Sequence, residues 1–449
     1  MVVEKSAVDE HEGTEVLVLL SPYLASTVGH RYAGSATTLA VRRLGSPAPV
    51  PRRRPVRGWP PVWTAAGLLL VAGLFRAAQN MGQTTFALFG RDDLNLGAAT
   101  IGSLGTVLGA FALVAALFVG GRLPASKASA AVGAGVCLLG ASLVVLGSAT
   151  SPWQFAGGTA LLGLAGGAAA PSLATAVGQA TPEGRDRALA HYAAVLSMSL
   201  ALGPLAETGL LELAHQHLRL PFFVFAALPV AALALGLFGR LRANALGVAN
   251  SPDPLHDSPL GSSGQLRSLL ATGDGRMALT VQLLYAVPFS AITVFGALVA
   301  RSVFNMTPAG AQLAFTVFFA ASLLSRLVVA RISPIDRKRR AFLLAAALTA
   351  AGVVLLSVGG PPLLLFIAMV LLGVPHGVTF PLALALTAQS VGEDQLAASN
   401  AALFAATSVV AVAAPVVLGV VAAAAGYRVM IVLVLAPVAA FSMLLMAQP

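Results

Sequence analysis

Residues 161–171 read LLGLAGGAAAP, and residues 371–381 read LLGVPHGVTFP. The two stretches share Leu-Leu-Gly, a second Gly four positions later and a Pro four positions after that, at an offset of 210 residues. Neither contains Asp, Glu, Lys or Arg. The repeat predicts two equivalent halves built from apolar helices.

Further matches occur in the same order along the chain. Asn95 corresponds to Asn305 and Pro124 to Pro334 at the same offset, and Pro204 corresponds to Pro415 after one added residue. Any one match is weak evidence, whereas the ordered set indicates an internal duplication. Parallel six-helix repeats are typical of membrane transporters.

The composition places these repeats in a lipid bilayer. Of the residues, 57% are hydrophobic and 10% are charged, and the mean hydropathy is +0.85. A bilayer core is crossed by roughly 20 apolar helical residues, because a helix satisfies its own backbone hydrogen bonds. We expect an all-α polytopic membrane protein with twelve transmembrane helices near 62–89, 98–120, 128–149, 153–178, 188–212, 221–240, 277–300, 309–331, 341–359, 362–387, 397–424 and 427–447.

Two longer polar stretches divide the chain. Residues 1–60 end in a basic run, and residues 243–275 are rich in Ser, Gly and Asp. Low hydrophobicity of this kind predicts disorder. We therefore expect a disordered basic tail at 1–60, a six-helix half at 61–242, a connector loop at 243–275 and a second six-helix half at 276–449.

The distribution of Lys and Arg predicts the orientation. Nineteen lie in the tail and in the turns that share its side of the membrane, within 42–57, 122–127, 185–187, 240–276 and 331–340. The opposite turns carry four, namely Arg91, Arg219, Arg301 and Arg428. Cytoplasmic loops are enriched in these residues, so both termini are expected to be cytoplasmic in the inner (plasma) membrane. Topology and anionic lipid then account for the net charge of +10 without nucleic-acid binding.

Residues 62–447 resemble the Major Facilitator Superfamily. The resemblance rests on the six-plus-six layout, the central connector, the Gly-rich fourth and tenth spans, and Leu202-Gly203-Pro204 in the fifth. The motif and gating residues that the resemblance implies are Gly121 and Lys127 in the turn after span two, Gly203 and Pro204 in span five, and Asp336, Arg337 and Arg340 in the turn after span eight. The resemblance implies alternating access around a mid-membrane site, with bacterial drug and metabolite efflux proteins as the most similar branch. Glu207 and Thr208 replace two glycines of that branch's fifth-span signature, and Thr159 replaces its fourth-span Arg.

Charged side chains inside the spans are few. Glu207 is the one carboxylate clearly within a span, Arg76 is the one base near mid-span, and Arg326 lies close to the inner end of span eight. His376 lies mid-span in the tenth. Such residues normally face a cavity or another protein group, so they are candidate functional residues.

Helical spacing places several of these side chains on polar stripes. Residues three or four apart share a helix face, and lipid excludes polar faces, so these stripes should line the central cavity or a helix contact. The candidate substrate-binding residues are Arg76, Gln79, Asn80, Gln83, Tyr192, Ser199, Gln282, Tyr285, Phe289, Thr293 and Phe380. Structural alternatives remain open, including neutralisation of Arg76 by Glu207 and a purely packing role for His376.

The sequence also indicates how transport is energised. No Lys follows a phosphate-binding Gly-rich loop, so the chain is not expected to hydrolyse ATP. A proton-driven cycle needs a titrating group in the cavity, and Glu207 is the first candidate, with His376 as the alternative. We expect protonation of Glu207 to release its attraction for Arg76 or for a cationic substrate.

The interpretation that fits best is a secondary active transporter that exports a small amphipathic organic compound as a proton antiporter. An importer or facilitator of a small anionic metabolite held by Arg76 is the alternative. A membrane-embedded enzyme is a remote one, because Asp92-Asp93 and Glu393-Asp394 lack a second acidic motif and no His-Glu-x-x-His occurs. We expect a monomer in lipid, with a small-molecule substrate and protons as partners and with no cofactor or metal ion.

Overall fold

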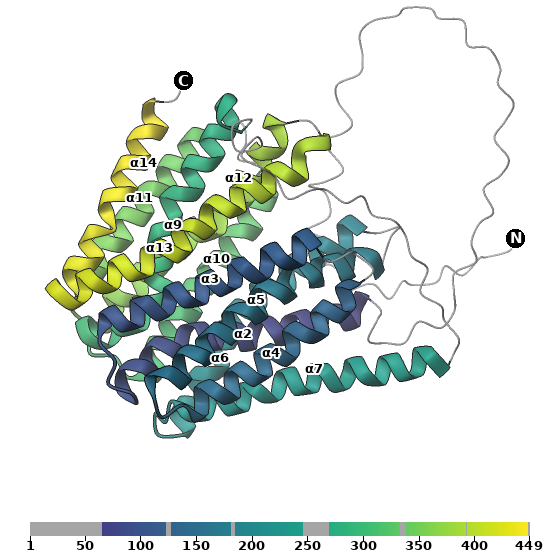
Figure 1. The fold of residues 1–449 in the computed structure, drawn as a ribbon. Helices are drawn as coiled ribbons and strands as arrows, with labels where there is room; N and C mark the ends of the chain where they lie inside the picture. The colour runs from purple at the N-terminus through teal and green to yellow at the C-terminus, as the bar shows by residue number, and fades with distance from the viewer. Residues whose placement is uncertain are drawn as a thin grey trace, which may run out of the picture.

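The computed structural model describes residues 65–122, 127–180, 185–245, 269–332, 338–391 and 393–447, and these residues are helical apart from short turns and caps. Figure 1 shows the helices as two bundles. The helices are α2 (Ala65–Asp92), α3 (Ala98–Arg122), α4 (Ala128–Ser148), α5 (Pro152–Ala180), α6 (Arg185–Leu213), α7 (Arg219–Ala245), α9 (Gly273–Phe304), α10 (Pro308–Ile332), α11 (Lys338–Val358), α12 (Pro362–Ser390), α13 (Glu393–Leu433) and α14 (Leu435–Ala447).

The first bundle contains α2–α7 and the second contains α9–α14 (Figure 1). The bundles meet chiefly where α3 lies beside α13 and where α6 lies beside α10. The expected all-α architecture of two six-helix halves is confirmed. The helix connections α2–α3, α4–α5, α6–α7, α9–α10 and α11–α12 and the turn at Gly426 define what we term the predicted outer end.

Nine helical stretches of the described residues are long and apolar enough to cross a membrane. The difference from twelve has physical causes. The polar stripe lowers the hydropathy of α2, and the apolar stretch counted in α7 covers only Arg219–Ala234. The stretch Ala402–Ala447 has 46 residues, or roughly 70 Å of helix, which is enough for two crossings of a core about 30 Å thick. Gly426, with φ 84° and ψ 167°, breaks this stretch between the two crossings.

The internal repeat is visible in the backbone. Asn95 and Asn305 both adopt left-handed conformations, with φ values of 53° and 54°. The amide that follows each Asn donates to the carbonyl six residues earlier, Leu96 to Gly90 at 2.8 Å and Met306 to Ala300 at 3.0 Å. These are equivalent helix C-caps, and Asn is one of the few residues that tolerates them.

The repeated glycines serve equivalent helix contacts. A Cβ atom on Gly163 would collide with the carbonyl oxygen of Leu108, and one on Gly373 would collide with that of Phe318. Gly167 and Gly377 approach the carbonyl oxygens of Ala112 and Ser322 in the same way. Small residues let neighbouring helices approach closely, so the Gly-rich spans are packing devices that hold α5 on α3 and α12 on α10.

Helices continue into both ends of the expected connector. α7 reaches Ala245, where Ala and Asn extend the last turn, and helical structure resumes at Leu269. Thr272 caps α9 by accepting a hydrogen bond from the Gly275 amide at 3.1 Å. The tail at 1–60 and residues 246–268 lie outside the described residues.

The two halves are held together near the predicted outer end. Gly102 of α3 and Gly419 of α13 bring their backbones together, since a Cβ on Gly102 would come within 2.9 Å of the Gly419 Cα. Four residues further along α3, the Thr106 hydroxyl donates to the Val412 carbonyl at 2.6 Å. Glycine on both sides makes this approach possible.

Candidate functional site

Two arginines from opposite halves lie beside the middle of α6. Arg76 of α2 donates to Gln79 Oε1 at 2.8 Å, and Arg326 of α10 donates to the Ser197 hydroxyl of α6 at 2.8 Å. Asn80, one turn after Arg76 on α2, donates to the Leu200 carbonyl of α6, so both arginines lie near residues 197–200 of that helix. We call this region, with the rings beside it, the central site.

Neither central arginine has an acidic partner. Among the described residues, the ion pairs join Arg219 to Asp93, Arg301 to Asp92 and Lys338 to Asp274, all near helix ends. The Nε atom of Arg326 is buried with no hydrogen-bond partner. A charged side chain at the bilayer centre costs about 2.5–3.5 kcal/mol on insertion scales, so two uncompensated cations are an expensive feature that packing alone does not explain.

An aromatic cluster adjoins the arginines. His376 of α12 stacks on Phe289 of α9, with ring centres 4.7 Å apart and planes 14° apart. Tyr285, Phe318 and Phe319 surround the same imidazole at 5.3–6.0 Å, and Ser322 Oγ lies 2.7 Å from its Nδ1 atom. Ser322 lies one turn before Arg326 on α10, so His376 adjoins that arginine. The cluster therefore forms an apolar wall beside the cationic centre.

The polar groups of several predicted binding residues form hydrogen bonds within the protein. Asn80 donates to the Leu200 carbonyl at 2.9 Å, Tyr192 to Ala170 at 3.1 Å and Tyr285 to Leu372 at 2.6 Å, each to another helix. The hydroxyls of Ser199 and Thr293 bond to carbonyls of their own helices. These contacts position α2, α6 and α9. Of the other predicted residues, Gln83 is half-buried, Gln282 has a buried Oε1 with no partner and Phe380 packs on Phe404.

A second polar cluster surrounds Glu207, which is fully buried. Thr85 of α2 donates to Glu207 Oε1, and Gln312 of α10 donates to the Thr85 hydroxyl at 3.4 Å. The second oxygen of Glu207 and the Oε1 of Gln312 are both buried acceptors without a partner. We call these three residues the carboxyl cluster. It joins the halves about six residues, or roughly 9 Å, from the predicted outer end of α6.

The expected attraction between Glu207 and Arg76 does not occur in this structure. Gly203 of α6 packs against Ala77 of α2. A Cβ atom added to Gly203 would lie only 2.9 Å from the Ala77 carbonyl oxygen. This register brings Glu207 to Thr85, nine residues and roughly 13 Å along α2 from Arg76. The direct pairing was therefore a wrong prediction, because the contact of α6 on α2 determines which side chains meet.

The motif residues divide into packing positions and helix ends. Gly203 permits the close contact with α2, and Pro204 is buried inside α6. Lys127 and Arg340 are exposed near the starts of α4 and α11. The side-chain surroundings of Gly121 and all of Asp336 and Arg337 lie outside the described residues.

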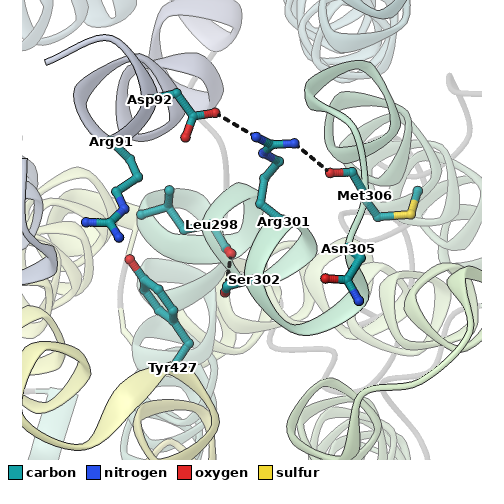
Figure 2. Close-up of a pocket in the computed structure, with 8 residues that line it drawn as sticks. All are labelled: Arg91, Asp92, Leu298, Arg301, Ser302, Asn305, Met306 and Tyr427. Carbon is teal, nitrogen blue, oxygen red and sulfur yellow. Dashed lines mark hydrogen bonds and ion pairs between the residues drawn. The ribbon is translucent and has the colours of Figure 1, made fainter. Parts of the chain in front are cut away.

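A cavity of about 260 Å³ lies at the predicted outer end, between the halves. Figure 2 shows Asp92 directed at Arg301, which also donates to the Met306 carbonyl at 3.1 Å, and Arg91 beside Tyr427. In this cavity Asp92 and Arg301 pair with each other, whereas the central arginines have no acidic partner among the described residues. Asp93, next in the chain, pairs with Arg219 at 3.2 Å, so the Asp92-Asp93 dipeptide serves ion pairs here. Within the described residues, no group of three His, Cys, Asp or Glu side chains could hold a metal ion.

Sequence reasoning missed several members of both clusters. Phe318, Ser322 and Arg326 recur at four-residue intervals and thus share one face of α10. Arg326 was already a candidate as a charged residue within a span, and its spacing to Phe318 and Ser322 was the signal that could have added those two. Thr85, Gln312 and Ser197 gave no comparable signal, because isolated Thr, Gln and Ser residues are common in membrane helices.

Comparison with known proteins identifies a family over most of the chain. The sequence model described as Major Facilitator Superfamily matches residues 68–299 and 278–448. The chain belongs to the Major Facilitator Superfamily. Among curated proteins, no relative matches the sequence.

Solved structures from the superfamily share the fold. They include the nucleoside transporter NupG, at 13% identity and a TM-score of 0.66, covering 85% of this chain and 98% of that one. A POT family transporter in complex with 5-aminolevulinic acid shows 11% identity, a TM-score of 0.68 and coverage of 85% and 95%. A bacterial homologue of the human lysosomal transporter Spinster, inward-facing and unoccupied, shows 13% identity, a TM-score of 0.63 and coverage of 86% and 97%.

Membership identifies the chain as a multi-pass membrane transport protein with a small-molecule substrate rather than an enzyme. Sequence identities this low support a shared fold and do not identify the substrate. The substrate and its coupling must therefore be argued from the side chains of this chain.

Proposed function

We propose that the chain is a proton-coupled antiporter that exports a small amphipathic organic compound by alternating access. It acts as a monomer in the inner membrane with both termini in the cytoplasm. The observation that carries the proposal is the carboxyl cluster, in which the sole intramembrane carboxylate of the described spans lies buried at the contact between the halves.

The two unpartnered acceptors of the carboxyl cluster suggest how protonation of Glu207 changes the contact between the halves. Thr85 bonds to both Glu207 and Gln312, so the unpartnered oxygens of those two residues belong to one small polar group. Two hydrogen-bond acceptors cannot bond to each other. A proton on Glu207 Oε2 converts that oxygen into a donor, and the Gln312 Oε1 atom of the other half is available to accept it. Leaving both unsatisfied would cost about 1–3 kcal/mol each.

Protonation then favours closure at the predicted outer end. The neutral carboxyl group joins α6 to α10, whereas the ionised carboxylate loses that bond and favours water. Thr208, the next residue in α6, reaches the Ala309 carbonyl at 3.4 Å, and Gln216 Oε1 accepts from the Ala309 amide at 2.9 Å. Release of the proton therefore acts on an interface that begins at Thr208, next to Glu207, and continues to Gln216 beyond the end of α6.

The central site supplies the substrate contacts. Phe289 and His376 offer an apolar face, and Arg76 and Arg326 offer hydrogen-bond donors. Substrate and proton thus occupy separate places in the same interface, and both act on the contact that opens and closes during alternating access. We assign His376 to the wall of the site and Glu207 to coupling.

The alternative function is import or facilitated movement of a small anionic metabolite. The paired arginines favour a negative charge on the solute, which Arg76 alone suggested less strongly. The direction of transport is what separates this alternative from the main proposal, and a growth screen of an expressing strain against toxic compounds tests it. Resistance indicates export, whereas sensitisation indicates import.

Glu207→Gln tests the coupling. Purified protein in liposomes without ATP should accumulate a compound from that screen when a pH gradient is imposed. The variant should lose this accumulation and still exchange labelled for unlabelled compound. Glu212→Gln is the matched control, because Glu212 is an exposed carboxylate on the same helix. Undiminished proton-driven accumulation in Glu207→Gln would refute the proposal.

A further inference from the structure

We propose, building on the transport function above, that the central site binds an organic anion. Its negative group lies between Arg76 and Arg326, and its apolar body lies on the stacked rings of Phe289 and His376. This assignment narrows the amphipathic substrate to one charge class and makes Arg326 a specificity-determining residue.

The first support is a contrast within the chain itself. Arg219 pairs with Asp93 at 3.2 Å and Arg301 pairs with Asp92 at 3.1 Å, and both arginines are half-exposed. The more deeply placed Arg76 and Arg326 have no acidic partner among the described residues, although burial makes a counter-charge more necessary. Placing two like charges together raises the cost further. A negatively charged ligand is the group that would remove both costs.

The second support is unused hydrogen-bonding capacity. Each guanidinium carries five N–H donors in a planar fork that matches carboxylate, sulfonate or phosphate oxygens. Arg76 donates to Gln79 and Arg326 donates to Ser197, and the Nε atom of Arg326 is buried without a partner. Both residues are therefore positioned by one neutral side chain and keep donors for a ligand.

The third support is the shape of the adjoining wall. Phe289 and His376 are parallel within 14° and both retain partial exposure, whereas Phe318 and Phe319 behind them are buried. Ser322, which bonds to His376, lies one turn before Arg326 on α10, so the wall lies beside the cation. A flat apolar body can pack on this face while its anionic group reaches the arginines.

Stability of the empty protein provides the first test. Arg76→Gln and Arg326→Gln should leave the Tm of the purified full-length chain unchanged or higher, because each removes a half-buried charge that has no acidic partner among the described residues. Arg219→Gln, the matched control, should lower it by removing an ion pair and two bonds to carbonyls. A fall in Tm in both central variants comparable to that in Arg219→Gln would assign the arginines a structural role and overturn the proposal.

Binding provides the second test, with probes of one shape and different charge. We expect 1-naphthalenesulfonate to bind and stabilise the protein, and 1-naphthalenesulfonamide and 1-naphthylmethylammonium to bind at least tenfold more weakly. Arg76→Gln and Arg326→Gln should each weaken sulfonate binding at least tenfold, and Arg326→Lys should restore part of it. Equal binding of the three probes, preference for the ammonium, or no binding of the sulfonate would overturn the proposal.

These measurements need no gradient and no transport. A failure here refutes the anionic substrate and leaves proton coupling through Glu207 intact. Conversely, normal proton-driven flux in Glu207→Gln refutes the coupling and leaves the anion site intact.

Discussion

Asp92 of α2 and Arg301 of α9 form an ion pair of 3.1 Å across the interface of the two halves, with about a third of each side chain exposed. Exposed pairs of this kind contribute about 0–1 kcal/mol, so this link can bias the conformation and cannot lock it. Closure at the predicted outer end must therefore depend mainly on the backbone contact of α3 with α13 and on the carboxyl cluster.

Asp92→Asn should shift the population toward opening at the predicted outer end by no more than roughly fivefold. Spin labels at Gly97, where a side chain meets open space, and at the exposed Leu363 would report the distance between halves. Asp93→Asn breaks the pair with Arg219 inside one half and serves as the control, which should leave the distance unchanged. A larger shift in the control than in Asp92→Asn would contradict the assignment of this link.

Gly102→Leu should hold the halves apart. The new side chain would meet the carbonyl oxygen of Pro415 and the backbone of Gly419, and backbone atoms cannot rotate aside. We expect a longer label distance at the predicted outer end and loss of proton-driven transport in a folded protein. Gly133→Leu on α4, where a Cβ meets nothing within 4 Å, is the control and should transport normally. Normal transport by Gly102→Leu would show that this contact is not needed for closure.

Sequence patterns predicted the helices and the repeat because both depend on local properties. Hydropathy located the spans, and the equivalence of Asn95 and Asn305 followed from an offset that the backbone reproduces in two identical caps. The same enumeration found Glu207, Arg76 and His376, since charged or titratable side chains inside apolar runs are conspicuous. These features required no knowledge of which helices touch.

The partners of those residues could not be predicted, because they depend on helix register. The Gly203–Ala77 contact brings Glu207 to Thr85 and away from Arg76, and nothing in either helix alone encodes that choice. Arg326 was placed near the inner end of span eight. The structure agrees, since Arg326 lies six residues before the end of α10 at Ile332, and it adds a bond from Arg326 to Ser197 of the other half. Its role depends on a helix that is 129 residues away in the sequence.

Thr85→Val should move the pH profile of proton-driven transport upward. The hydroxyl donates to Glu207 Oε1 and stabilises the ionised carboxylate. Removing that donor makes the carboxylate less favourable, so the proton is retained to higher pH. Thr349→Val is the control, because Thr349 is a buried residue of α11 whose hydroxyl bonds only to its own helix. A shift downward, or an equal shift in Thr349→Val, would contradict the role of Thr85.

The predicted orientation has its own test. Reporters fused after residue 449 and inserted within 246–268 should both be cytoplasmic, because the basic residues divide nineteen to four in favour of that side. A reporter that is active only outside the cytoplasm should be silent at both positions and active when it is inserted after Ser151 in the short α4–α5 turn. Activity at either cytoplasmic position would overturn the orientation and reverse the proposed direction of the outer end.

Membrane potential should drive the proposed anion outward. Moving one elementary charge through 100 mV is worth about 2.3 kcal/mol, which corresponds to a concentration ratio of roughly 40-fold. Liposomes that contain 1-naphthalenesulfonate and wild-type protein should release it when a potassium gradient makes the interior negative. The sulfonate is permanently charged, so leakage of a neutral acid does not contribute, and protein-free liposomes measure the remaining leak. Release should slow at least tenfold in Arg326→Gln, which lacks one of the two central charges, and should persist in Arg219→Gln reconstituted at the same density. Flux that ignores the potential, or accumulation inside negative vesicles, would mean that the transported species carries no net negative charge.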